Sequence, residues 1–275
     1  MRCCVHPRFR CRRPASGFSL VELLVCVAII GALLALMLPA LGAARTLGAR
    51  TVCQSNLRSM QLAFQQYLDE HEDRWFPFRE DTPEGVLWYF GLERSGGSSA
   101  EGERPLDKTR ARLAPYLGSG GGAGGVENCP SLPVRAPYFK RKFEYASYGY
   151  GINAYMLEGL PGAGRMGIHR MSQVREPSET ITWADSIQIN TFQPPATPSR
   201  PMLEEWYFLD GLPLPKFHFR HASRLNAAFA DHSVQVLRPS LLDARCDGQA
   251  GYLGAPRDEY WLLTRKPESP VAARD

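Results

Sequence analysis

The sequence lacks the motifs that would mark a common enzyme or a nucleic-acid-binding protein. It contains no CxxC pair, no GxSxG or HExxH motif, and no glycine-rich run with the lysine and hydroxyl of a phosphate-binding loop. Five of the 32 lysines and arginines lie in residues 1–17, which contain no acid, and the other 27 accompany 28 acids. The rest of the chain thus has no basic excess for phosphate binding, and we expect no nucleic-acid partner.

Cysteine is scarce beyond the first 26 residues. Four of the seven cysteines lie in the basic leader or in the apolar run that follows it, namely Cys3, Cys4, Cys11 and Cys26. Cys53, Cys129 and Cys246 remain, and three cysteines cannot all pair within one chain. The pattern does not indicate a zinc cluster or a thioredoxin-type site, but it permits one disulfide in an oxidising compartment.

Residues 18–41 are almost entirely apolar, reading FSLVELLVCVAIIGALLALMLPAL. A helix needs about 20 apolar residues to cross the hydrocarbon of a bilayer, so we predict a transmembrane helix here. The basic leader, residues 1–17, would stay on the cytoplasmic side by the positive-inside rule. We therefore expect a single-pass protein of the cytoplasmic membrane whose later residues are exported to the periplasm or cell surface.

Glu22 is the only charged residue between Phe18 and Leu41. A carboxylate near the edge of the hydrocarbon costs a few kcal/mol unless it reaches the interface or finds a partner. One interpretation is an interfacial side chain that snorkels towards water. The other comes from its neighbours, because Gly17, Phe18 and Glu22 form the sequence GFSLVE directly after an arginine-rich leader.

This arrangement resembles the class III signal of type IV prepilins and type II secretion pseudopilins. The resemblance implies that prepilin peptidase cuts between Gly17 and Phe18, methylates the new amino group of Phe18 and leaves the anchor in place. It also implies that Glu22 pairs with the amino terminus of an adjacent pilin-like subunit during assembly on a platform protein. Pro39 lies where pilin helices commonly kink.

Residues 42–74 are predicted to continue as an amphipathic stalk helix. Leu57, Met60, Phe64 and Leu68 recur at the helical period and form one apolar face. The long helix, from residue 18 to about residue 71, would pack this face against a head formed by residues 75–275. Cys53 at the end of the stalk and Cys129 at the start of the head are the predicted disulfide pair, and Cys246 is the alternative partner for either.

The head is predicted to be an α+β domain with an antiparallel sheet. Aromatic residues at 75–78 are expected to close its core, with a carbohydrate or partner surface as the alternative. A short helix is expected over residues 106–117, between glycine-rich loops at 95–103 and 118–125. Strands are predicted within residues 145–155, 180–183 and 225–237, the last forming a hairpin with Asp231 and His232 at its turn.

Several short motifs of the stalk and the head carry a second resemblance. They are Cys53 with Asn56 and Leu57, a CP pair at Cys129, SYGYGIN at 147–153, VREPSETITWADS at 174–186, and His221 nine residues ahead of Asp231. Together they resemble the DUF1559-type family of pilin-like proteins found in Planctomycetes, Verrucomicrobia and Lentisphaerae. The C-terminal signature of that family is a histidine, nine residues and Asp-Gly, and here His232 replaces the glycine.

Candidate binding and catalytic residues are few. His218, His221, Asp231 and His232 lie close in sequence and include metal-ligand types, but strand alternation argues against one shared site. We expect instead an imidazole–carboxylate hydrogen bond that fastens the hairpin, and no metal or cofactor. Glu204 and Glu205 are adjacent and are expected to be solvated loop residues rather than a catalytic pair.

The sequence thus predicts a non-enzymatic pilin- or pseudopilin-like subunit that assembles through its N-terminal helix in a type IV pilus or a type II secretion-like system. The alternative is a monomeric membrane-anchored surface protein that binds polysaccharide or a metal and uses the signal only for processing.

Overall fold

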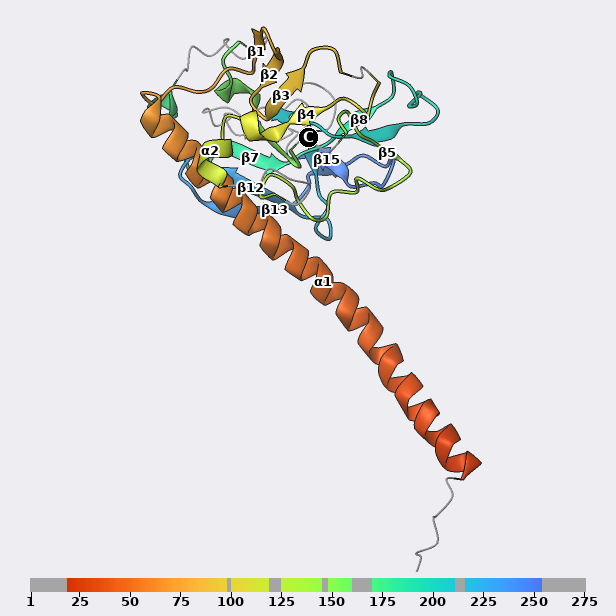
Figure 1. Cartoon of the computed structure of the whole chain (residues 1–275). Helices are drawn as coiled ribbons and strands as arrows, with labels where there is room; N and C mark the ends of the chain where they lie inside the picture. The colour runs from red at the N-terminus through yellow and green to blue at the C-terminus, as the bar shows by residue number, and fades with distance from the viewer. Residues whose placement is uncertain are drawn as a thin grey trace, which may run out of the picture. The chain divides into compact units, whose positions relative to one another are not determined.

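The computed structural model describes residues 19–97, 100–118, 125–144, 148–159, 170–210 and 216–253 (Figure 1). The chain divides into two compact units, residues 1–45 and 46–275. The predicted leader and the predicted cleavage site between Gly17 and Phe18 lie outside the described residues.

Helix α1, Leu20–Glu70, begins in the first unit and ends in the second. It continues through Pro39 and has the length and location that the sequence predicted for the combined membrane and stalk helix. Its C-terminal part buries one face, which contains Cys53, Leu57, Met60, Gln61, Ala63, Phe64, Tyr67 and Leu68. The predicted apolar stripe is therefore the surface that packs on the head.

The end of α1 is closed by two residues in the left-handed conformation, Glu72 (φ 55°) and Asp73 (φ 62°). The Asp73 amide donates to the Leu68 carbonyl at 2.8 Å, which satisfies one carbonyl of the last turn. A neighbouring segment holds this turn: Ser172 N donates to Asp73 Oδ2 at 2.9 Å, and the Arg170 side chain donates to the Glu72 carbonyl at 2.7 Å.

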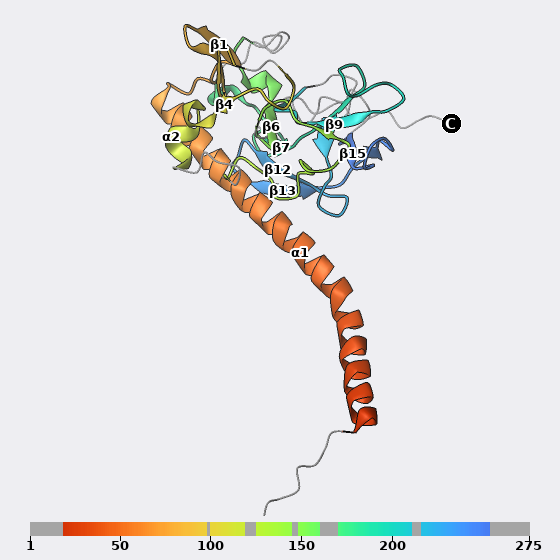
Figure 2. The ribbon, with the colours of Figure 1, turned by 45° about the vertical axis from the view of Figure 1, so that its right-hand side comes forward.

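The central sheet of the second unit has the strand order β10-β6-β7-β12-β13. Its strands are β6 (Tyr150–Asn153), β7 (Ile181–Asp185), β10 (Phe208–Leu209), β12 (Leu225–Phe229) and β13 (Val234–Leu237). β12 and β13 form the predicted hairpin, with Leu225 opposite Leu237. The C-terminal part of α1 lies along this sheet in both views of the ribbon (Figures 1 and 2).

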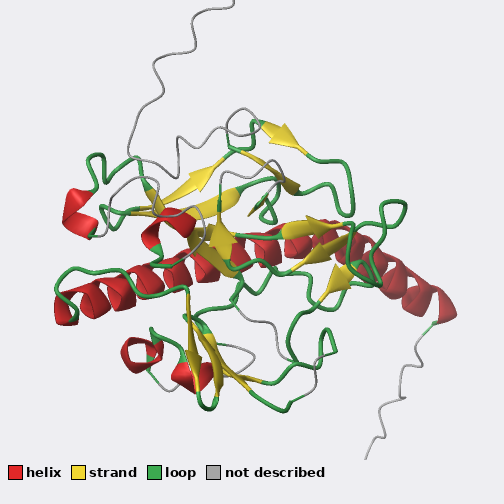
Figure 3. Cartoon of the chain, turned by 90° about the horizontal axis from the view of Figure 1, so that it is seen from above, coloured by secondary structure: helices red, strands yellow, loops and turns green. Residues whose placement is uncertain are grey.

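Three smaller sheets of short strands complete the described head (Figure 3). The first sheet runs β1 (Arg79–Thr82), β2 (Gly85–Trp88), β3 (Gly91–Arg94), β4 (Leu106–Asp107). The second runs β11 (Phe217–His218), β15 (Ala250–Tyr252), β14 (Leu241–Leu242). The third runs β5 (Phe139–Lys140), β9 (Met202–Glu204), β8 (Gln188–Asn190).

The sequence suggested an antiparallel sheet, but two of the four described sheets, the central one and the one formed by β5, β9 and β8, are mixed. β10 pairs with β6 in parallel, and β5 pairs with β9 in parallel. Among the described residues, all other strand pairs are antiparallel. The parallel pairs are only two residues long, and each joins segments more than 50 residues apart. Such short, distant pairings leave no periodic signal in the sequence.

The prediction of one helix over residues 106–117 is wrong. The segment begins as strand β4, turns through a 3₁₀ helix η1 (Lys108–Arg110) and ends as a short helix α2 (Ala114–Leu117). Asp107 accepts a hydrogen bond from Thr109 N at 3.1 Å, and Ala111 is extended, with φ −60° and ψ 147°. The aspartate cap and the extended residue divide the segment, because neither continues a helical hydrogen-bond ladder.

An aromatic core joins α1 to the sheets. The Phe64 ring lies 5.4 Å from that of Phe76 and 6.0 Å from that of Trp183, both edge-on. Trp75 and Phe76 are buried, so the aromatic run after the helix closes the core, as expected. One buried polar contact crosses the same interface: Thr182 Oγ1 donates to Gln61 Oε1 at 2.6 Å.

The described residues also contain two short 3₁₀ helices, η2 (Ala154–Met156) and η4 (Met171–Gln173).

Candidate functional site

The first candidate site is the N-terminal end of α1. Ser19 Oγ accepts a hydrogen bond from Val21 N at 3.3 Å, and the Glu22 carboxylate accepts one from Ser19 N at 2.8 Å. This is a capping box in a variant form, because Ser19 Oγ accepts from the second helical residue rather than the third, and it satisfies two of the free amides at the helix start. Glu22 therefore has a partner within its own chain. The sequence SLVE carries the S-x-x-E signature, which the sequence analysis did not use.

The helix beyond this cap exposes apolar side chains on all of its sides. Leu20 is 80% exposed, Leu36 75% and Leu38 67%, and the first unit buries none of its described residues. By length and composition α1 is apolar enough to cross a membrane. Apolar groups in this number are stable only in lipid or against other proteins, because water does not solvate them favourably.

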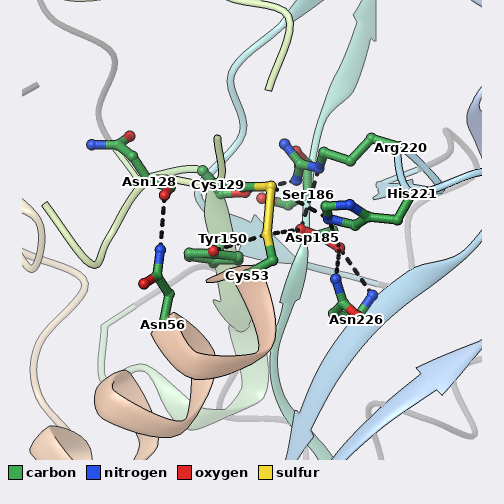
Figure 4. The surroundings of a disulfide bond; sticks show 11 residues. Cys53, Asn56, Asn128, Cys129, Tyr150, Asp185, Ser186, Arg220, His221 and Asn226 are labelled. Atoms are coloured by element: carbon green, nitrogen blue, oxygen red, sulfur yellow. Dashed lines mark hydrogen bonds and ion pairs between the residues drawn. A yellow bond between two sulfur atoms is a disulfide. The ribbon is translucent and has the colours of Figure 1, made fainter. Parts of the chain in front are cut away.

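The second candidate site is a buried polar cluster around a disulfide in the second unit. Cys53 of α1 and Cys129, the predicted pair, form a disulfide with a Cα–Cα distance of 5.4 Å. Side chains from the central sheet and the loop before β12 surround it (Figure 4): Tyr150 on β6, Asp185 on β7, Asn226 on β12, and Arg220 and His221 in the loop. We call these seven residues the disulfide cluster.

Asp185 is the centre of the disulfide cluster and is fully buried. Its Oδ1 lies 3.2 Å from Arg220 Nε, and its Oδ2 accepts hydrogen bonds from Asn226 N at 2.9 Å and from Asn226 Nδ2 at 3.3 Å. Burial raises the pKa of Asp185 to about 6, although the Arg220 guanidinium and the Asn226 hydrogen bonds oppose that change. The last residue of β7 is thus a carboxylate that Arg220 holds on one side and Asn226 on the other.

Two other members of the disulfide cluster, Tyr150 and His221, face the sulfurs. The Tyr150 hydroxyl lies 3.0 Å from Cys53 Sγ, and because a disulfide sulfur has no proton, the hydroxyl is the donor. His221 Nε2 lies 3.4 Å from Cys129 Sγ and 3.5 Å from Asp185 Oδ2. Burial and the neighbouring Arg220 charge lower the pKa of His221 to about 3, so its imidazole is neutral at physiological pH. Burial also raises the pKa of Tyr150.

The structure separates the histidines and the aspartate that lie close in sequence. His218 Nε2 pairs with Asp247 Oδ2 at 3.0 Å, His221 lies beside Asp185, and Asp231 and His232 are exposed in the hairpin turn. Both buried imidazoles thus have carboxylate partners, Asp247 and Asp185, and neither partner is Asp231. The prediction of an imidazole–carboxylate bond that fastens the hairpin is therefore wrong. In the turn, Asp231 Oδ1 accepts from Ser233 N at 3.0 Å.

Glu204 and Glu205 are buried, so the prediction of a solvated loop is wrong for both. Glu204 ends β9 and lies 3.5 Å from the ammonium groups of Lys140 and Lys142. Glu205 Oε1 accepts a hydrogen bond from Lys142 N at 2.6 Å. Two lysines distant in sequence thus provide positive charge beside the buried Glu204, and a backbone amide satisfies Glu205. Nothing in the local sequence around the two glutamates signals this environment.

Comparison with known proteins identifies the N-terminal site. Residues 12–38 match the family described as the prokaryotic N-terminal methylation motif. The matched range contains Gly17, Phe18 and Glu22 and ends within the exposed apolar part of α1. No curated protein and no solved structure matches the chain. The resemblance of the head to the DUF1559-type family therefore stays a prediction.

The motif and the fold together define a class of protein. An N-terminal methylation motif is typical of prepilin- and pseudopilin-like proteins, and this chain has their layout of a long apolar helix followed by an α+β head. The motif indicates processing by prepilin peptidase. The apolar helix that carries it indicates a membrane-associated or exported protein.

Proposed function

We propose that the chain is a non-enzymatic structural subunit of a type IV pilus or a type II secretion-like system. The observation that supports it most strongly is the methylation motif at residues 12–38, followed by a helix whose apolar side chains are exposed on every side. A helix used only as a membrane anchor needs no processing signal before it. In a fibre, by contrast, the same apolar surface is covered by the helices of neighbouring subunits.

In this proposal, prepilin peptidase removes residues 1–17 and methylates Phe18, and the mature chain stays in the cytoplasmic membrane with its head exported. The partners are other pilin-like subunits, identical or different, and the assembly platform. Glu22 then binds the methylated amine of an adjacent subunit, a charge-assisted contact in a poorly solvated setting. The head, of the DUF1559 type, carries the contacts that distinguish this subunit from others.

Processing is tested by the intact mass of the protein extracted from membranes. We expect the loss of residues 1–17 and the gain of one methyl group on Phe18. Gly17→Trp should leave unprocessed precursor in the membrane, whereas Gly17→Ala, which keeps a small side chain, is the matched control and should be at least partly processed. A mature chain that starts at Met1, or at any residue after Leu41, contradicts the proposal.

A further inference from the structure

The disulfide cluster contains four side chains of the types that bind transition metals. They are Cys53, Cys129, Asp185 and His221, all buried, and one ligand atom from each lies within 4.8 Å of the others. We propose that, when the disulfide is reduced, these four side chains bind one Zn²⁺ ion. Oxidation and metal binding are then two mutually exclusive states of one site in the head.

The distances between ligand atoms fit a tetrahedral ion. Zinc lies about 2.3 Å from thiolate sulfur and about 2.0–2.2 Å from imidazole nitrogen or carboxylate oxygen, which puts neighbouring ligand atoms about 3.3–3.8 Å apart. Three such distances are already present: Cys53 Sγ to Asp185 Oδ1 is 3.7 Å, Cys129 Sγ to His221 Nε2 is 3.4 Å, and His221 Nε2 to Asp185 Oδ2 is 3.5 Å. The two Asp185 distances are to different carboxylate oxygens, so the carboxylate would turn slightly to bind through one of them. The two sulfurs, which are bonded to each other in the oxidised form, must separate.

The charges of the cluster also balance in the metal-bound state. The Asp185 carboxylate and the Arg220 guanidinium, 3.2 Å apart, already offset each other. Two thiolates and one Zn²⁺ add no net charge, so the buried site stays neutral overall. Arg220 and Asn226 hold the carboxylate from outside, in the way that outer partners orient metal ligands.

The change from the disulfide state to the zinc-bound state requires a reductant and releases protons. A dithiol gives two electrons and two protons to the Cys53–Cys129 bond, which breaks into two thiols while the dithiol itself becomes a disulfide. Zinc then displaces both thiol protons and binds the two thiolates. The oxidised cluster cannot bind the ion in this way, because neither sulfur carries a negative charge.

The test uses the full chain in detergent, with every cysteine except Cys53 and Cys129 replaced by serine. The protein is reduced with excess dithiol under argon, freed of dithiol by gel filtration, and titrated with Co²⁺ and then with Zn²⁺. We expect one Co²⁺ per reduced chain, with thiolate-to-cobalt charge-transfer bands and the intense visible bands of a tetrahedral ion, which Zn²⁺ then removes. The oxidised protein should show none of these bands.

Variants separate this site from general metal binding. His221→Ala and Asp185→Asn should each weaken Zn²⁺ binding at least about tenfold, since even the loss of an outer partner costs about 10–100-fold. His232→Ala, which removes an exposed histidine outside the cluster, is the matched control and should bind as the parent does. Equal binding by His221→Ala and the parent would overturn the proposal.

The metal site can be tested even if the protein unfolds when its disulfide is reduced. If the reduced chain loses its circular dichroism, added Zn²⁺ should restore the spectrum in the parent but not in His221→Ala. Reduced protein that stays folded and binds no stoichiometric metal, or that unfolds and is not restored by Zn²⁺, excludes the site. None of these results depends on assembly into fibres, so they are separate from the proposed function.

Discussion

His232 occupies a backbone position that favours glycine. It lies in the turn between β12 and β13 with φ 68°, and its amide donates to the Phe229 carbonyl at 2.9 Å. A side chain in this left-handed region costs about 1–2 kcal/mol, although histidine is among the residues that adopt it more often than most. An Asp-Gly pair at this turn would avoid this cost.

We therefore expect His232→Gly to stabilise the head. The gain in the free energy of unfolding should be about 0.5–1 kcal/mol, because the relief of backbone strain exceeds the entropy that glycine adds to the unfolded chain. His232→Ala keeps the strain and is the control for loss of the imidazole. Urea denaturation followed by tryptophan fluorescence measures both, and a stabilisation of equal size in His232→Ala would contradict the explanation.

The His218–Asp247 pair should make stability depend on pH. Burial lowers the pKa of His218 below its ordinary 6.5, and although burial alone would raise that of Asp247, the hydrogen bond from His218 lowers it. The unfolded chain therefore takes up a proton on His218 at a pH where the folded chain does not. We expect the free energy of unfolding to decline as pH falls from about 6.5 towards 5.

The control for this dependence is His218→Gln, whose amide can donate to Asp247 but does not titrate. Its urea midpoint should change less than that of the unaltered protein between pH 7 and 5. Parallel midpoints for the two proteins over this range would show that another group is responsible.

At the scale of single elements, the buried face of α1 is the main link between helix and sheets. Phe64 is fully buried against Phe76 and Trp183, whereas Leu62 on the same helix is 60% exposed. Phe64→Ala should cost about 3–5 kcal/mol, the usual loss when a core aromatic leaves a cavity. Leu62→Ala should change stability by no more than about 0.5 kcal/mol. Similar losses for the two variants in urea denaturation would show that the helix face is assigned incorrectly.

The disulfide should add to the stability of the same element. Its two cysteines are 76 residues apart. Closing a loop of this size lowers the conformational entropy of the unfolded chain, which typically adds about 2–4 kcal/mol to the free energy of unfolding. Cys53→Ser should lower the free energy of unfolding by about this amount, and Cys246→Ser, which removes a thiol outside the bond, should not. Peptide mapping without reductant should recover Cys53 linked to Cys129; recovery of both as free thiols contradicts the assignment.

The elements predicted correctly were those with a strong local period. The stripe from Leu57 to Leu68 repeats at the helical period, and the hairpin is formed by neighbouring segments, so both are visible in a short window of sequence. The parallel pairs, the burial of Glu204 and the position of Asp185 depend on segments far apart in the chain. Their partners, such as Lys140 for Glu204 and Arg220 for Asp185, cannot be identified from local pattern.

At the scale of the whole molecule, the capping box makes the role of Glu22 separable by mutation. Ser19→Ala removes the side-chain acceptor of the cap but keeps the carboxylate, whereas Glu22→Leu removes the carboxylate itself. If Glu22 acts by binding the amine of a neighbouring subunit, Glu22→Leu should abolish most fibre yield and Ser19→Ala should largely preserve it. Cleavage and membrane content should be unaffected in both variants.

The measurement compares sheared-fibre yield, and crosslinking through an engineered cysteine at Leu23, with total membrane-bound protein. Equal losses in the two variants would mean that helix capping, and not subunit pairing, explains the effect. Equal crosslinking in Glu22→Leu and the unaltered protein contradicts pairing. An absence of crosslinks in the unaltered protein and in both variants favours the monomeric membrane-anchored surface protein.

The disulfide also determines how the head responds to pulling. Cys53 is the first buried residue of α1, so tension applied along the helix from its N-terminal side reaches this bond before the rest of the packed face. The load then passes covalently to Cys129, and the intervening chain carries none of it. At about 3.4 Å per residue, the 76-residue separation corresponds to about 260 Å of extended chain. An oxidised head under tension would therefore release about 260 Å less chain than a reduced one.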